Sequence, residues 1–156
     1  MPTPQQQTYI DQLRAFPAQL EALVRPLSDA QLEMRESPHE WSVRQIVHHL
    51  ADSHLNTMAR FKLPLTEEQP TIRPYDQDKW AQLADYALPL ESSLRILRGL
   101  HERFVALLNS LTPEQWQRPL RHPDSGELVV EDVARIYAGH GLDHIAQIRR
   151  ALGLRD

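Results

Sequence analysis

The sequence predicts an all-α protein built as a four-helix bundle, in a single domain that spans residues 1–156. Four stretches of about twenty residues carry apolar side chains at intervals of three and four, the spacing of one face of an α-helix. Glycine is scarce, and most of the twelve prolines lie between these stretches or at their ends, where helices stop. A chain of 156 residues is long enough for one hydrophobic core and short for two domains.

The first predicted helix covers residues 5–27, and Pro17 inside it predicts a kink. Directly after this helix, Ser28 and Gln31 have the spacing of a capping box, which predicts a short helical turn. The apolar face of the first helix consists of Tyr9, Leu13, Phe16, Leu20, Leu23 and Leu27.

The second predicted helix begins near Ser42 and ends at Pro64, because proline lacks the N–H that continues a helix. Residues 64–89 hold four prolines and one short helical candidate, residues 76–83. We therefore expect a long ordered crossover between helices two and three. The apolar face of the second helix consists of Val43, Val47, Leu50, His54, Met58 and Phe61.

The third predicted helix covers residues 90–111, and the last covers residues 130–152 and stops at Gly153. Between them, residues 112–115 have the pattern of a short helix start, and the turn residues within 121–130 predict a small hairpin or a bend. The long crossover permits a bundle in which neighbouring helices are not consecutive in the sequence.

Composition excludes several classes of protein. No apolar run approaches the eighteen or so residues that a membrane-spanning helix needs. A net charge of −4 argues against a protein whose main task is binding nucleic acid. The absence of cysteine excludes disulfides, thiolate metal sites and a cysteine nucleophile. The first ten residues lack the features of a secretory signal, so we expect a cytoplasmic protein.

Two of the eight histidines, His140 and His144, lie four residues apart on the apolar face of the last helix. This spacing lets two imidazoles reach one metal ion. Two buried imidazoles also need polar partners, which a metal supplies at once. From spacing and orientation alone, a metal site and two hydrogen-bonded core histidines are equally compatible with the pattern.

A catalytic metal site needs a third protein ligand, and the second helix offers His49 and His54. His54 lies in the middle of the apolar face, whereas His48 and His49 flank it on opposite sides. In a bundle whose second helix is covered from more than one side, a flanking position can also face the interior, so His49 and His54 both stay open. His101, central on the third helix, is expected to hydrogen-bond a ligand or to belong to the core.

The other polar candidates have weaker signals. Asp143 is not the glutamate of a zinc-protease HExxH motif and lies toward the edge of the apolar face, so we expect it on the surface or beside a ligand. Arg73, Tyr75 and Trp80 either line a cleft above the bundle or pin the crossover to it.

The chain resembles the DinB/YfiT-like family of small metal-binding four-helix bundles. The resemblance covers about residues 41–152, and the run from Trp41 to His54 and the closing histidine motif are its specific parts. It rests on Trp41–Gln45 (WSVRQ), His48–His54 (HHLADSH), Arg60–Lys62 (RFK), Leu65–Glu67 (LTE), Arg73–Asp76 (RPYD) with Trp80, His122–Asp124 (HPD) and His140-x-x-x-His144-x-x-Gln147.

The resemblance implies a metal held by His49, His140 and His144, and it thereby favours His49 over His54. Members of the YfiT branch are described as metal-dependent hydrolases or as S-transferases for bacillithiol, a low-molecular-weight thiol. Members of that branch often carry further histidines near the last ligand, whereas this chain has Asp143 and Gln147. These two residues, together with His54 and His101, are candidates for hydrogen bonds to the ligands.

The leading functional hypothesis is transfer of a small thiol to an electrophilic small molecule at a three-histidine site with one divalent transition metal, zinc or nickel. The first alternative is a metal-dependent hydrolase that uses an activated water. The second alternative is a non-enzymatic metal-binding stress-response protein. We expect small-molecule partners and neither nucleic acid nor membrane; a homodimer is compatible with the sequence.

Overall fold

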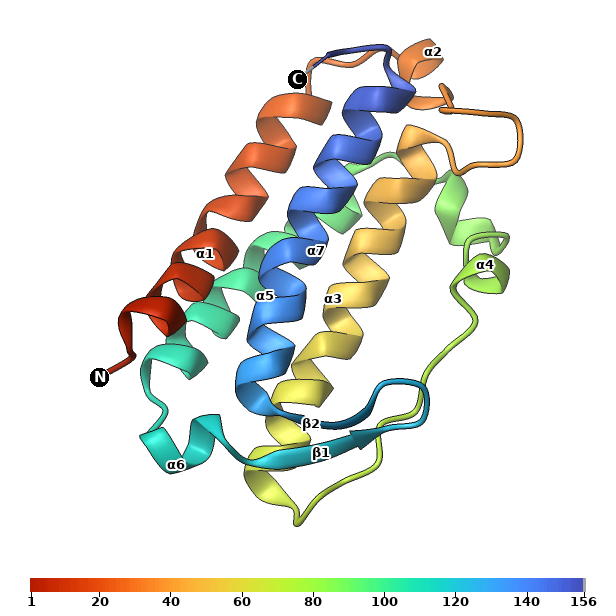
Figure 1. Cartoon of the computed structure of the whole chain (residues 1–156). Coiled ribbons are helices and arrows are strands. Elements are labelled where there is room, and N and C mark those ends of the chain that lie inside the picture. Colours follow the sequence, from red (N-terminus) through yellow and green to blue (C-terminus); the bar gives the residue numbers. More distant parts are fainter. Residues whose placement is uncertain (156) are drawn as a thin grey trace.

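The computed structural model describes residues 1–155; Asp156, the last residue of the predicted domain, lies outside the described residues. Four long helices form the bundle: α1 (Pro4–Val24), α3 (Val43–Thr66), α5 (Glu91–Asn109) and α7 (Val130–Ala151) (Figure 1). The four-helix bundle predicted from the sequence is confirmed. In residues 1–155, no helix has the length and apolarity needed to cross a membrane.

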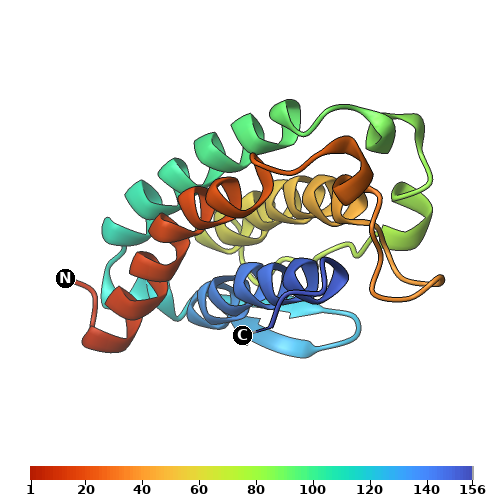
Figure 2. The same ribbon diagram turned by 90° about the horizontal axis from the view of Figure 1, so that it is seen from above.

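The helices are not packed in the order of the sequence. α1 packs along α5 and α7, and α3 packs along the same two helices, so α1 and α3 lie diagonally across the bundle, which Figure 2 views from above. α3 and α5 run in the same direction, and the chain between them returns along the length of the bundle (Figure 1). This return is the predicted long crossover, and it covers one side of α3.

Short elements lie at the two ends and along the crossover. α2 (Asp29–Leu32) follows α1, while α4 (Gln77–Trp80) and the 3-10 helix η1 (Ala84–Ala87) belong to the crossover. α6 (Pro113–Trp116) leads into the antiparallel hairpin of β1 (Pro119–His122) and β2 (Gly126–Val129). The crossover is fixed to this hairpin, because the Ile72 N–H donates to the Arg121 carbonyl at 2.8 Å.

Two helix ends beside prolines differ from the prediction. α1 ends at Val24 instead of Leu27, because Pro26 follows and cannot donate the next helical hydrogen bond. α3 does not end at Pro64 but continues to Thr66. A proline in the last turn leaves only one carbonyl without its helical donor, and the turn is closed by the Glu67 N–H donating to Leu63 at 2.8 Å.

The core consists of two apolar clusters separated by a layer of histidines. On α1 the change from one cluster to the other falls between Leu13 and Phe16, and on α5 it falls beside His101. On α3 it falls at His54, which is fully buried. On α7, His140 and His144 occupy the interval between Ala138 and Ile148. The bundle therefore places a layer of imidazoles from α3, α5 and α7 at mid-height, between the two apolar clusters.

Candidate metal centre

Three histidines from two helices converge between α3 and α7. One ring nitrogen of each of His49, His140 and His144 lies within 4.8 Å of the other two. The ring centroids of His140 and His144 are 4.5 Å apart, and those of His49 and His144 are 4.9 Å apart. The structure thus brings together the three residues that the family resemblance implied, while His54 contacts His140 Nδ1 at 3.3 Å and is not one of the three.

Helical geometry explains this convergence. His140 and His144 are one turn apart on α7, so their rings lie on the same face. His49 belongs to the second turn of α3, whose start is fixed by a capping box between Ser42 and Gln45. His49 lies off the main apolar face because it faces α7, whereas the main face contacts α5 and α1. The Trp41 ring, which precedes the cap, packs on His49 with centroids 4.5 Å apart.

The rings of His140 and His144 each have a partner at Nδ1, and their Nε2 atoms face each other. His144 donates from Nδ1 to Gln147 Oε1 at 2.7 Å, and His140 Nδ1 contacts the ring of His54 at 3.3 Å. The two Nε2 atoms are 3.2 Å apart. Two nitrogens bound tetrahedrally to zinc at its usual bond length lie about 3.4 Å apart.

The donor set therefore fits a divalent transition metal. Facing lone pairs on two Nε2 atoms repel each other unless a cation or a proton lies between them. His49 Nδ1 is buried and has no hydrogen-bond partner among the described residues. These three imidazoles could hold a metal ion, and their chemistry is that of zinc, nickel or copper ligands.

Burial keeps these imidazoles neutral, which is the form that binds metals. Burial and the neighbouring His144 lower the pKa of His49 to about 3. Burial, His144, His49 and Arg60 lower the pKa of His140 to about 3. The pKa of His144 is also lowered by burial, while Gln147 and Asp143 oppose this. Near pH 7 each ring is therefore neutral and keeps one nitrogen lone pair available.

The remaining helix histidines lie outside this cluster. His54 is fully buried and hydrogen-bonded between His140 and His101, and His101 lies one ring further from the cluster. His101 is thus neither a fourth member of the cluster nor in contact with one. His48 is turned the other way, toward Ser93 at 2.6 Å and the Leu88 carbonyl at 2.8 Å. It ties α3 to α5.

A surface hollow of about 210 Å³ opens beside His144. This volume is smaller than the roughly 300–1,000 Å³ of pockets that enclose a drug-sized ligand. The hollow therefore suits the reactive end of a small molecule whose remainder stays in solvent. It is lined by His39, Glu40, Trp41, Gln77, Asp78, His144 and Gln147.

The predicted cleft residues are only partly near the cluster. Tyr75 is half-buried, and its ring is tilted against that of Trp80, with centroids 4.3 Å apart. Its hydroxyl is hydrogen-bonded to Ser53 of α3. Burial raises the pKa of Tyr75 to about 12, although the hydrogen bond to Ser53 acts in the opposite direction. Arg73 and Asp143 are both exposed. Gln147, by contrast, contacts a member of the cluster directly.

One residue near the cluster had no predicted role. Arg60 is half-buried, donates to the Tyr137 hydroxyl and acts electrostatically on His140. No carboxylate among the described residues is hydrogen-bonded or ion-paired to it. Arg60 follows His49 by eleven residues, close to three helical turns, so the two share one face of α3. That spacing is the signal in the sequence that could have found it.

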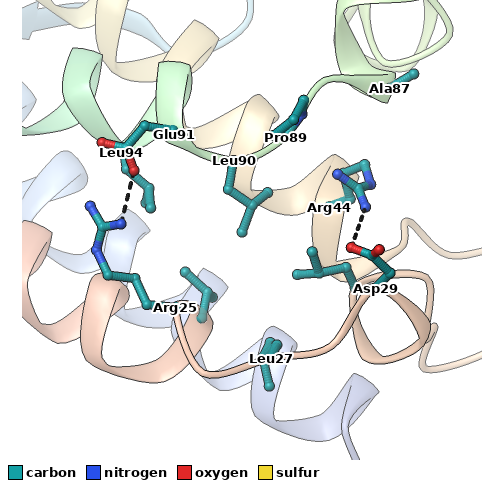
Figure 3. A pocket seen from close by; sticks show the side chains of 11 residues that line it. Arg25, Leu27, Asp29, Arg44, Ala87, Pro89, Leu90, Glu91 and Leu94 are labelled. Carbon is teal, nitrogen blue, oxygen red and sulfur yellow. Dashed lines mark hydrogen bonds and ion pairs between the residues drawn. The ribbon is translucent and has the colours of Figure 1, made fainter.

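A separate hollow lies between the end of α1 and the start of α5 (Figure 3). Its two cations are already paired: Arg25 contacts Glu91 at 2.8 Å, and Arg44 contacts Asp29 at 4.0 Å and Glu33 at 2.8 Å. Paired surface charges of this kind mainly hold the two segments together. The candidate functional site is therefore the histidine cluster.

Comparison with known proteins agrees with this geometry. The family model described as DinB superfamily matches residues 12–148. The chain belongs to the DinB superfamily. Among solved structures, this DinB protein is similar to YfiT from Bacillus subtilis, described as a probable metal-dependent hydrolase with an unusual four-helix bundle topology. The TM-score is 0.92 and the identity 40%, over 99% of this chain and 91% of YfiT.

Curated relatives of this DinB protein carry the same kind of name. A protein of Oceanobacillus iheyensis named "Putative metal-dependent hydrolase" is 43% identical over 90% of this chain and 81% of its own length. A protein of Halalkalibacterium halodurans with the same description is 41% identical over 94% and 85%. The metal dependence in these names matches the three-histidine group found in this structure.

Proposed function

We propose that this chain is a divalent-metal-dependent enzyme acting on a small molecule, with His49, His140 and His144 as metal ligands. The observation that carries the proposal is the 3.2 Å approach of two Nε2 atoms, each on a ring whose Nδ1 already has a partner. Three protein ligands leave an open coordination position, which is typical of catalytic sites and not of closed structural ones. Neutral nitrogen ligands suit zinc or nickel.

The reaction that we propose is thiol transfer. A divalent ion at this site supplies Lewis acidity, which lowers the pKa of a thiol or a water at the open position. A free thiol has a pKa of about 8.5, against about 15.7 for water, so a thiol needs much less help from a protein base. In residues 1–155, no carboxylate is hydrogen-bonded or ion-paired to any of the three histidines. The site therefore suits a thiol better than water.

The bonds of this reaction balance without a further reagent. The sulfur of the small thiol bonds to an electrophilic carbon while the bond from that carbon to its leaving group breaks. The leaving group departs with the electron pair, and the thiol proton passes to solvent. The hollow beside His144 receives the reacting ends, and the positive charge of Arg60 attracts an anionic group of either molecule.

Hydrolysis is the second candidate, and the names of the relatives favour it. In this reaction a water oxygen bonds to the electrophilic atom and the leaving group departs. The water proton needs an acceptor, and Glu40 and Asp78, which line the hollow beside His144, are the candidates.

The metal site is tested by elemental mass spectrometry of untagged protein purified without chelator. We expect about one transition metal per chain, retained by His48→Ala and lost from His49→Ala and His140→Ala. His48 is the matched control, because it is buried on the same helix but bonded to Ser93 and Leu88. Wild-type protein that holds no metal even after reconstitution would overturn the proposal.

The reaction is tested by product analysis with the metal-loaded protein. Thiol transfer predicts a thioether product that requires added thiol and disappears with His140→Ala. Product formed without thiol would favour hydrolysis. Bound metal with no turnover in either assay would instead support a non-enzymatic metal-binding role.

A further inference from the structure

The buried His101 and His54 and the partly buried His140 form a continuous row of hydrogen bonds that leads from α1 to the candidate metal centre. His101 Nδ1 lies 2.6 Å from the Leu13 carbonyl oxygen of α1. His101 Nε2 lies 2.6 Å from His54 Nδ1, and His54 Nε2 lies 3.3 Å from His140 Nδ1. The free end of the row is His140 Nε2, which faces His144.

The row begins at a carbonyl that α1 leaves without a helical donor. In a regular helix the Leu13 carbonyl accepts from the N–H of residue 17, but residue 17 is proline and has no N–H. The helix nevertheless continues through Pro17. The freed carbonyl can only accept a hydrogen bond, so the proton between it and His101 must be on His101 Nδ1.

This fixed end determines the direction of every other bond in the row. A neutral imidazole has one N–H and one lone pair. His101, with its N–H on Nδ1, offers a lone pair on Nε2, so His54 must donate from Nδ1. His54 then offers a lone pair on Nε2, so His140 must donate from Nδ1. His140 Nε2 is consequently left with a bare lone pair.

We propose that His101 and His54 are positioning residues that hold His140 in the Nδ1–H tautomer, so that its Nε2 is ready to bind the metal. The inference rests on the proposed metal centre. Residues that orient a ligand histidine usually hydrogen-bond it directly, as Gln147 does for His144. For His140 the orientation is set two imidazole rings away, by the Leu13 carbonyl that Pro17 frees on α1, and α1 supplies no metal ligand.

The burial of the row supports this role. His54 and His101 are 0% and 2% exposed, and both contact the ring of Phe16, at 5.4 and 5.1 Å between centroids. An apolar side chain would fill this space without polar partners, whereas two imidazoles are stable here only when each nitrogen is paired. Within the row, every nitrogen of His54 and His101 has a partner.

The first experiment measures histidine tautomers in the metal-free wild-type protein by imidazole 15N NMR. We expect His101, His54 and His140 all to carry the proton on Nδ1. An Nε2–H tautomer at His140 would overturn the proposal. This readout needs neither metal nor turnover.

The second experiment measures zinc affinity of His101→Phe by competition with a chelator. Removing His101 leaves His54 Nδ1 without an acceptor, so the row can reverse and protonate His140 Nε2. We expect a mixed His140 tautomer and zinc binding weakened by about 10–100-fold. The matched control is His48→Phe, which removes a buried histidine with two hydrogen bonds outside the row. It should bind zinc like wild type.

Zinc affinity of His101→Phe equal to wild type would show that His101 is only a core residue and would overturn the positioning role. If the variant does not fold, the wild-type tautomers still decide the question. Wild-type protein with the expected tautomers but without zinc binding would refute the proposed metal centre while supporting the directed row.

Discussion

Gly141 of α7 packs directly against the ring of Phe16 of α1. A Cβ atom on residue 141 would lie 2.7 Å from both Cδ2 and Cε2 of Phe16. The same ring contacts His54 and His101, and Gly141 follows His140 directly in the sequence. The close approach of α1 and α7 therefore depends on a glycine placed between two members of the histidine cluster.

Substitution of Gly141 tests this contact. We expect Gly141→Ala to lower the free energy of unfolding by about 1–2 kcal/mol, because the added methyl group overpacks the core. Gly139→Ala is the control on the same helix, where an added Cβ meets nothing within 4 Å. It should stabilise by about 0.5–1 kcal/mol through helix propensity. Urea unfolding of the metal-free proteins measures both, and equal effects of the two substitutions would contradict the packing argument.

The fold could be predicted from the sequence because its helices are amphipathic and well bounded. The capping box at Ser28 is present as predicted, and the helix predicted to begin near Ser42 does so, with a capping box of its own. The errors concern prolines: α3 continues past Pro64, and α1 ends before Pro26, whereas the predicted continuation of the first helix through Pro17 is confirmed. Pro17 frees the carbonyl of Leu13, and the partner of that carbonyl is His101 of another helix, which the sequence of α1 does not show.

The candidate site was less accessible to sequence reasoning. Periodicity shows the main face of a helix, and His54 lies on that face, whereas His49 faces a second neighbour that periodicity does not identify. Only the family resemblance separated the two. The link between His101 and Leu13 joins residues 88 positions apart, so no local pattern in the sequence shows it.

The buried histidines predict a stability that falls in mild acid. The folded-state pKa values of His49 and His140 are about 3 and that of His101 is about 4, all below the ordinary value of 6.5. Between each folded-state pKa and 6.5, the unfolded chain binds more protons than the folded protein. The stability that these neutral imidazoles contribute is therefore fully present above pH 6.5 and is lost as the pH falls toward the folded-state pKa. Each such histidine contributes about 1.4 kcal/mol per pH unit. Urea unfolding of metal-free protein between pH 7 and 4.5 should show this slope, and His101→Phe should make it shallower. A flat profile would mean that these imidazoles are not buried in their neutral form.

Gln147 provides a matched pair of variants for the metal centre. Gln147→Leu removes the acceptor for the His144 Nδ1–H, so zinc affinity should fall by about 10-fold or more. Gln147→Glu keeps an acceptor and adds negative charge, so affinity should be equal to or higher than that of wild type. Isothermal titration with zinc distinguishes the two. Equal affinity of wild type and Gln147→Leu would show that the His144 ring is held by other contacts.

Arg60 predicts a preference for anionic substrates. The side chain is half-buried near His140 and donates only to the Tyr137 hydroxyl among the bonds described. A guanidinium without a carboxylate partner retains its charge for a carboxylate or phosphate on the substrate. Arg60→Gln should therefore lower kcat/KM for an anionic electrophile by about 10-fold, mainly through KM, and leave a neutral electrophile nearly unaffected. Lys62→Gln, an exposed position on the same helix, removes an equal charge and serves as the control. Equal losses for anionic and neutral electrophiles would indicate that Arg60 supports Tyr137 structurally instead of binding substrate.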